Sequence, residues 1–199
     1  MQKKLLALTA GLLMTSQAFA DDDSWLVRAR VIDVAPQVST SGTLSSLGIG
    51  VDKQVVPELD FTYMFTKNIG TELILGTARH QVTSNGTSLG HVSHLPPTLT
   101  LQYHFAPDAT VRPYAGVGVN YTRFYDAHLN AGGPLSIDNN SFGASLQIGT
   151  DVMVNKDWFV NIDLKKLYIK TDVKTAGGTD LGNLRVNPLV FGVGFGTHF

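Results

Sequence analysis

Hydrophobic and polar residues alternate along most of the chain with a period of two, which is the spacing of a β-strand with two different faces. Between positions 57 and 66 the apolar face is formed by Leu59, Phe61, Tyr63 and Phe65, and most of the intervening residues are polar. The same alternation recurs about eight times, whereas helical periodicity is nearly absent. The predicted strands cover residues 24–36, 57–66, 69–82, 96–105, 111–126, 141–154, 158–173 and 185–199.

The connections between these strands alternate strictly in length. Short turns are predicted at 67–68, 106–110 and 155–157, and long segments rich in Gly, Ser, Thr and Asn at 37–56, 83–95, 127–140 and 174–184. Short turns at one end and long loops at the other are typical of outer-membrane barrels, whose short turns lie in the periplasm. The pattern predicts an all-β fold, an eight-stranded antiparallel transmembrane β-barrel with four long extracellular loops and both termini in the periplasm.

Alternation alone does not say which face meets lipid, because a soluble lipocalin-type barrel carries its apolar face inside. Three features favour the membrane version. Glycine runs at 116–118 and 192–196 leave space in the lumen or ease curvature. The chain ends in Phe199 on the apolar register, which resembles the signal read by the outer-membrane assembly machinery, an expected partner. The aromatic residues expected to form interfacial girdles are Trp25, Tyr63, Phe65, Tyr103, Phe105, Tyr121, Tyr125 and Trp158.

The first 20 residues have the pattern of a cleaved signal peptide. Two lysines at positions 3 and 4 precede an apolar stretch at 5–14, and Ala18-Phe19-Ala20 has the small-x-small form that signal peptidase cuts. The apolar stretch is shorter than the roughly 20 residues that a membrane helix needs. A buried N-terminal helix is the alternative. We therefore expect residues 1–20 to be a cleaved signal peptide and residues 21–199 to form one outer-membrane β-barrel domain.

Composition agrees with export to the outer membrane. The chain contains no cysteine, which suits a barrel better than a small secreted domain that depends on disulfides. A formal net charge of −1 gives no indication of nucleic-acid binding. No cofactor is implied by any motif, and outer-membrane lipid is the expected surrounding.

Five segments together resemble the OmpW/AlkL family of small outer-membrane proteins across essentially the whole predicted barrel domain. The Pro-Pro-Thr-Leu and Arg-Pro-Tyr-Ala-Gly-x-Gly blocks are the most specific parts of the resemblance. The resemblance implies an eight-stranded barrel associated with the passage of small hydrophobic molecules, and some family members serve as bacteriocin receptors. The segments are Trp25–Arg30, Pro57–Tyr63, Leu95–Phe105, Arg112–Thr122 and Asn187–Phe199.

Inward-facing polar residues gather toward the periplasmic ends of the strands. The interior of an eight-stranded barrel is only about wide enough for side chains to fill, so paired charges there would close the aqueous route. Arg28 and Arg112 are expected to neutralise Glu72, Asp151 or Asp163. The alternative is that such a network only stabilises the barrel. The expected periplasmic polar plug consists of Arg28, Asp60, Glu72, His104, Arg112, Asp151 and Asp163.

Toward the outer mouth the inward positions become apolar, and Ile74, Phe124 and Leu167 are expected to line a funnel. A closed lower end would force a solute that enters from outside to leave sideways into the bilayer. Proline donates no ladder hydrogen bond, so two prolines at the top of a strand weaken its pairing. The alternative is that Pro96 merely begins the strand. The lateral gate candidates are Pro96, Pro97, Leu95, Leu99 and Ala78.

These features predict an outer-membrane channel for passive uptake of small hydrophobic molecules, with lateral release into the bilayer. The alternative is a surface receptor or structural barrel, on whose loops a bacteriocin or phage docks without any physiological solute.

An enzyme is not expected. A barrel-embedded hydrolase would need a Ser–His pair, for which His80 with Ser84 or Ser93 is the one set available. His91-x-x-His94 lies in a predicted loop without an obvious carboxylate or cysteine partner, so ordinary surface histidines are expected there, and no metal site.

Overall fold

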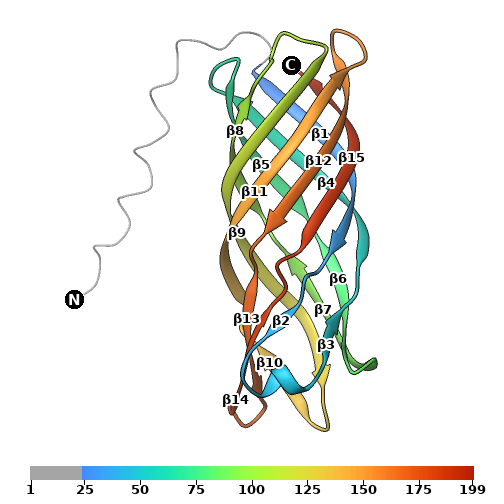
Figure 1. Ribbon diagram of the computed structural model, residues 1–199, viewed down its shortest axis with the longest axis vertical. Coiled ribbons are helices and arrows are strands. Elements are labelled where there is room, and N and C mark those ends of the chain that lie inside the picture. Colours follow the sequence, from blue (N-terminus) through green and yellow to red (C-terminus); the bar gives the residue numbers. More distant parts are fainter. Residues whose placement is uncertain (1–23) are drawn as a thin grey trace, which may run out of the picture.

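The computed structural model describes residues 24–199, and the predicted signal peptide lies outside them. Eight strands form a closed antiparallel wall, in which each strand pairs with the next and the last pairs with the first (Figure 1). The predicted eight-stranded barrel is therefore confirmed. The wall strands are β1 (Trp25–Ala35), β4 (Gln54–Met64), β5 (Ile69–Gly76), β8 (Thr98–His104), β9 (Val111–Asn130), β11 (Asn140–Met153), β12 (Trp158–Leu167) and β15 (Leu189–His198).

The sheet continues beyond the wall at the end opposite the C-terminus, where the four predicted long connections lie (Figure 1). Each of these connections contains short strand segments, which the sequence pattern did not predict. Asn85 and Gly86, both at positive φ (46° and 82°), make the tight turn between β6 and β7, a hairpin signal in the sequence. The added elements are β2 (Ser39–Thr40), η1 (Gly42–Ser46), β3 (Ile49–Val51), β6 (Ala78–Ser84), β7 (Thr87–Leu95), β10 (Pro134–Ile137), β13 (Lys170–Thr175) and β14 (Asp180–Arg185). Among residues 24–199 no helix is long and apolar enough to cross a membrane.

The inner face of the wall is polar and the outer face is apolar, as a membrane barrel requires. Inside, Thr100 and Asn161 are completely buried, whereas outside Val117 and Phe142 keep 59% and 74% of their surface exposed. Aromatic side chains pair on the outer surface near both rims, for example Trp25 with Tyr63 at 5.0 Å between ring centroids. A soluble barrel would place these apolar side chains inside, so the lipocalin-type alternative is excluded.

Glycines on the inner face allow neighbouring strands to approach closely. A Cβ atom built on Gly118 would lie 2.2 Å from the carbonyl oxygen of Leu99 and 2.7 Å from Ser145 Oγ. A Cβ on Gly194 would lie 2.1 Å from the carbonyl oxygen of Ala29. The glycines were expected either to leave space in the lumen or to ease the curvature of the strands. At both positions the close approach of neighbouring strands favours the second role.

We predict that Gly118→Ala destabilises the barrel by about 1–3 kcal/mol, since the added methyl group overpacks the wall. Gly133→Ala is the control, because a Cβ there meets nothing within 4 Å. Urea unfolding in phospholipid vesicles, followed by tryptophan fluorescence, measures the free energy of unfolding. Equal stability of the two variants would show that the wall tolerates a side chain at position 118.

Candidate functional site: a sealed lumen beside a break in the wall

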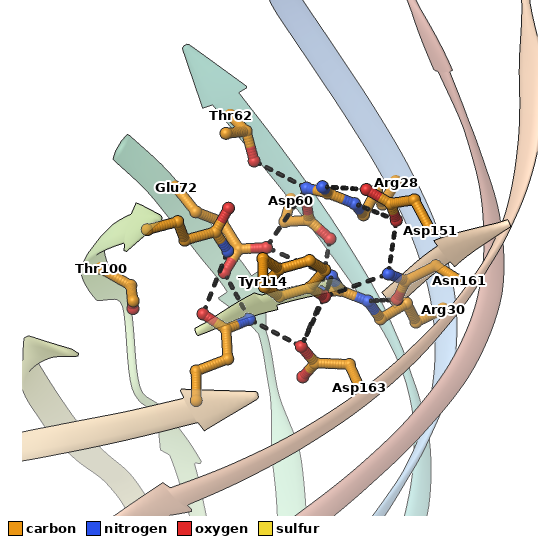
Figure 2. A network of polar contacts seen from close by, with 12 residues as sticks. Arg28, Arg30, Asp60, Thr62, Glu72, Thr100, Tyr114, Asp151, Asn161 and Asp163 are labelled. Atoms are coloured by element: carbon orange, nitrogen blue, oxygen red, sulfur yellow. Dashed lines mark hydrogen bonds and ion pairs between the residues drawn. The ribbon is translucent and has the colours of Figure 1, made fainter. Parts of the chain in front are cut away.

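Arg28 and Arg30 occupy successive inward positions of β1, and both side chains are fully buried in the lumen (Figure 2). Arg28 forms a fork with Asp151, in which Nε donates to Oδ1 at 3.1 Å and Nη2 donates to Oδ2 at 2.7 Å. Its Nη1 donates to Thr62 Oγ1 at 2.7 Å. Paired forks of this kind are among the strongest hydrogen-bonded ion pairs in proteins.

Arg30 brings together polar and acidic groups from three other strands. Its Nη1 lies 3.0 Å from Glu58 Oε1 and 2.6 Å from Asp60 Oδ2, and its Nη2 lies 3.2 Å from Glu72 Oε1. Its Nε donates to Asn161 Oδ1 at 2.6 Å. The guanidinium group therefore links β1 to β4, β5 and β12 across the lumen (Figure 2).

Further donors complete the network around the carboxylates. Lys165 Nζ lies 2.5 Å from Glu58 Oε1 and 3.3 Å from Asp163 Oδ1. The Tyr114 hydroxyl donates to Asp163 Oδ2 at 2.7 Å, and Gln147 Nε2 donates to Asp163 Oδ2 at 2.7 Å. Three cations thus face five carboxylates, with hydroxyl and amide donors supplying the remaining bonds. We call this set the lumen network: Arg28, Arg30, Glu58, Asp60, Thr62, Glu72, Gln102, Tyr114, Gln147, Asp151, Asn161, Asp163 and Lys165.

The lumen network separates two cavities. A vestibule of about 730 Å³ at the periplasmic end is bordered by His104, Asp151 and Phe159. A second cavity of about 30 Å³ is bordered by Glu58 and Lys165 on the far side of the network. Side chains of the lumen network occupy the barrel between these two cavities.

The structure places most of the predicted plug residues in the lumen network or against it, somewhat deeper than the periplasmic rim. His104 joins from its edge, where its Nε2 lies 3.2 Å from Gln102 Oε1 and its ring stacks on Tyr114. Arg112 is the exception: its Nε donates to the Ala109 carbonyl at 2.9 Å, and the side chain borders the vestibule. The expectation that Arg112 neutralises the buried carboxylates is corrected, because Arg30 has that position.

Sequence reasoning missed Arg30, Glu58, Lys165 and Tyr114 as members of the lumen network. Arg30 lies two residues after Arg28, so the period of two places it on the same inward face. Lys165 has the same relation to Asp163. The parity of the strands was thus a usable signal, which the prediction did not follow at these four positions.

Apolar side chains fill the lumen between the network and the outer opening. Phe124 and Leu167 belong to one buried cluster, and Ile74 borders the cavity of about 30 Å³ beneath it. A cavity of that size corresponds to about one water molecule. The buried cluster consists of Ile32, Val34, Val82, Val92, Phe124, Leu167, Ile169 and Val190.

The wall itself is interrupted next to this cavity. The ladder between β5 and β8 ends at the pair Ile74–Thr98, and the ladder between β6 and β7 begins at Ala78–His94 in the same register. Pro96 and Pro97 lie in the interval, and Gly76, Thr77 and Pro96 border the cavity. We call this interval, residues 75–77 and 95–97, the wall break.

Side-chain hydrogen bonds bridge the wall break. Thr77 Oγ1 donates to the His94 carbonyl at 3.0 Å and lies 2.6 Å from the Tyr125 hydroxyl. On the opposite side Pro97 remains attached to β9, because the amide of Tyr121 donates to its carbonyl at 3.0 Å. Of the other gate candidates, Ala78 is buried beside the cavity, while Leu95 and Leu99 face outward at 39% and 50% exposure.

The wall is interrupted a second time, between the β12–β15 ladder and the β13–β14 ladder, and this interval is bridged in a different way. There the amide of Leu167 donates to the Pro188 carbonyl at 3.1 Å, and the amide of Val186 donates to the Ile169 carbonyl at 2.9 Å. Backbone bonds therefore cross this interval directly. The contrast makes the wall break at Pro96 the weaker of the two interruptions.

The residues considered for catalysis do not form a Ser–His pair. His80 is buried, its Nδ1 lies 2.7 Å from the Asp52 carbonyl, and its Nε2 has no hydrogen-bond partner. Ser84 Oγ instead donates to the Leu47 carbonyl. The His91-x-x-His94 pair also diverges, since His94 stacks on His80 inside while His91 faces Asp126 outside.

An apolar outer belt, aromatic rims and a polar, filled lumen define this chain as an integral outer-membrane β-barrel. The family model of the OmpW family matches residues 21–199, so the chain belongs to the OmpW family. Outer membrane protein W of Escherichia coli (strain K12) is 37% identical over 97% of both chains. The dibenzothiophene metabolism operon protein PahQ of Pseudomonas aeruginosa is 31% identical over 94% of this chain and 93% of its own.

Solved structures agree with this assignment. The crystal structure of the outer membrane protein OprG from Pseudomonas aeruginosa superimposes with a TM-score of 0.79 at 28% identity, covering 89% of this chain and 96% of that one. The solid-state NMR structure of AlkL in lipid bilayers has a TM-score of 0.70 at 20% identity, covering 100% and 97%, and shows the same fold.

We predict that Arg30→Met destabilises the barrel by about 3–5 kcal/mol, because three buried carboxylates lose their common cation. The control is Lys67→Ala, which removes an ion pair with Asp108 at 3.0 Å whose partners are 66% and 76% exposed. Urea unfolding of both variants in vesicles measures the difference. Similar small losses would mean that the lumen network does not hold the barrel together.

Proposed function

We propose that this protein is an outer-membrane channel for passive uptake of small hydrophobic molecules. The solute enters the apolar outer part of the lumen and leaves sideways into the bilayer through the wall break. The observation that carries the proposal is the juxtaposition of a sealed lumen and an interrupted wall at the same height. A solute stopped by charged side chains finds the weakest part of the wall beside it.

The chemistry of the route favours apolar solutes. The small cavity is lined mainly by apolar side chains, including Ile74, Ala78, Leu167 and Val190, and the wall break opens toward outward-facing Leu95 and Leu99. One relative is named for an operon of dibenzothiophene metabolism, and dibenzothiophene is a compact apolar compound. Passage requires movement, since a cavity of about 30 Å³ cannot hold such a molecule. The conformation described is therefore a closed one.

The proposal also covers assembly of the barrel into the outer membrane, in which we expect Phe199 to take part. Phe199 keeps 61% of its surface exposed at the rim, and its backbone forms a reciprocal pair with Trp25, with both N–O distances at 3.0 Å. A C-terminal aromatic side chain on the lipid-facing surface of the closing strand is available to the outer-membrane assembly machinery.

A disulfide across the wall break tests the proposal. Because the chain contains no cysteine, the two introduced cysteines can pair only with each other within the protein. Gly76 and Pro96 lie opposite each other when the ladder register is continued, and the Cα atoms of opposed residues in an antiparallel ladder are about 4.5–5.5 Å apart, which a disulfide spans. A Cβ on Gly76 meets nothing closer than 3.7 Å. We expect oxidised Gly76→Cys/Pro96→Cys to lower uptake of an apolar probe to the level of cells without the protein, and reduction to restore it.

The matched control is Val117→Cys/Leu146→Cys, an opposed outward pair in the continuous part of the wall. This disulfide should leave uptake unchanged. Normal uptake through the oxidised Gly76→Cys/Pro96→Cys barrel would overturn lateral release at this position.

Restoring hydrogen-bond donors gives an independent prediction. Pro96→Ala/Pro97→Ala adds two backbone N–H groups, of which the one at position 96 can pair across the wall break and the one at position 97 faces β9, so we expect slower uptake of the apolar probe and greater stability of the β6–β7 hairpin. Probe entry into cells and hydrogen exchange of residues 78–95 measure the two effects. Normal transport by the folded variant would contradict a gating role for the prolines.

A further inference from the structure

Two histidines and an aspartate converge on the outward face of the barrel extension, away from the lumen. His91 Nε2 lies 3.5 Å from Asp126 Oδ2, and His128 Nδ1 lies 3.2 Å from Asp126 Oδ1. One donor atom from each residue can be chosen so that all three lie within 4.8 Å of one another. The side chains are 29%, 41% and 70% exposed for His91, Asp126 and His128, so the group is open to solvent.

The backbone holds these residues together. His91 on β7 and His128 on β9 are directly opposed in the ladder, and the next pair is Ser93 with Tyr125. Two residues of β9, at 126 and 127, therefore face the single residue between His91 and Ser93, which is a β-bulge. Asp126 adopts a positive φ of 49° within this bulge, and its carboxylate turns toward both imidazoles.

We propose that His91, Asp126 and His128 form a binding site for Zn²⁺. Two imidazole nitrogens and one carboxylate are a common ligand set for this ion, and bonds of about 2.0–2.1 Å in a tetrahedron separate the donor atoms by roughly 3.4 Å. The imidazole nitrogens lie at distances close to that spacing from the two oxygens of the Asp126 carboxylate, His91 Nε2 at 3.5 Å from Oδ2 and His128 Nδ1 at 3.2 Å from Oδ1. Solvent exposure leaves the fourth position for water. The ion links β7 to β9 next to Tyr125, whose hydroxyl contacts Thr77 at the wall break.

Arg79 competes for this position. Its Nη2 lies 2.6 Å from His91 Nε2, and its Nη1 lies 4.0 Å from Asp126 Oδ2. The side chain is 60% exposed and is free to turn into solvent when the ion binds. If the three residues form only a surface ion-pair cluster, Arg79 stabilises it and its removal would not strengthen zinc binding. If they form a zinc site, removal of Arg79 should raise the affinity for zinc. This opposite dependence separates the two interpretations.

The test is calorimetric titration of ZnCl₂ into the full barrel in detergent micelles, purified without a polyhistidine tag. We expect one ion per wild-type chain and at least about tenfold weaker binding by His91→Ala and His128→Ala, each of which removes a ligand. Arg79→Ala should bind zinc more tightly than the wild type. His198→Ala, at the opposite rim, is the control for the loss of one histidine and should bind as the wild type does.

Folding of each variant is checked by the mobility of unheated protein on SDS gels. We expect all four variants to fold, because none of the substituted residues belongs to the lumen network. Absence of wild-type binding, binding that survives both ligand substitutions, or weaker binding by folded Arg79→Ala would overturn the zinc site. The last result would leave an ion-pair cluster in its place.

Discussion

Arg28 and Arg30 lie two residues apart on one strand with no exposed side-chain surface, and the interior of the barrel is organised around pairing them. An unpaired charge in such a place costs several kcal/mol, so each guanidinium requires acidic partners from other strands. Glu58 and Asp60 come from the neighbouring strand, while Glu72, Asp151 and Asp163 come from further around the wall. Because these partners lie on every side, pairing fixes the register of the wall and fills its lumen at once.

The consequence for function follows from this filled lumen. Paired charges in the centre of the barrel support the proposal that it is not a water pore, and the apolar cluster above them favours apolar solutes over a sugar or an ion. The wall break lies at the boundary between these two regions, where Glu58 and Pro96 border the same small cavity. In lipid, unpaired backbone groups are costly, so a break in the ladder is tolerated only where other contacts or a solute cover it. Thr77, with its bonds to His94 and Tyr125, supplies such cover in the closed state.

Much of the wall could be predicted from sequence because alternation is a local signal. Where two strands are joined by a short turn, register could be predicted too: the turn at 67–68 nearly fixes the observed pairing of Thr62 with Glu72. β1 and β4 are separated by a long connection, and no local rule places Arg30 opposite Glu58. Arg112 was predicted as a partner of the buried carboxylates and Arg30 was not, although both lie on inward positions of their strands. Of the strands of the extension, β6 and β13 fall largely within the predicted strands 69–82 and 158–173, whereas β2, β3, β7, β10 and β14 were missed, since their polar, glycine-rich residues carry little alternation of their own.

The central claim is that the lumen is closed to water and that apolar solutes pass by way of the wall. The most direct test compares entry of an apolar fluorescent probe, N-phenylnaphthylamine, with entry of a small sugar into vesicles whose outer leaflet is lipopolysaccharide. The account predicts that the protein accelerates entry of the apolar probe and leaves the sugar at the rate of protein-free vesicles. Equal acceleration of both would mean an open aqueous pore, and acceleration of neither would mean a barrel whose outer extension serves as a docking surface; either result would contradict the account.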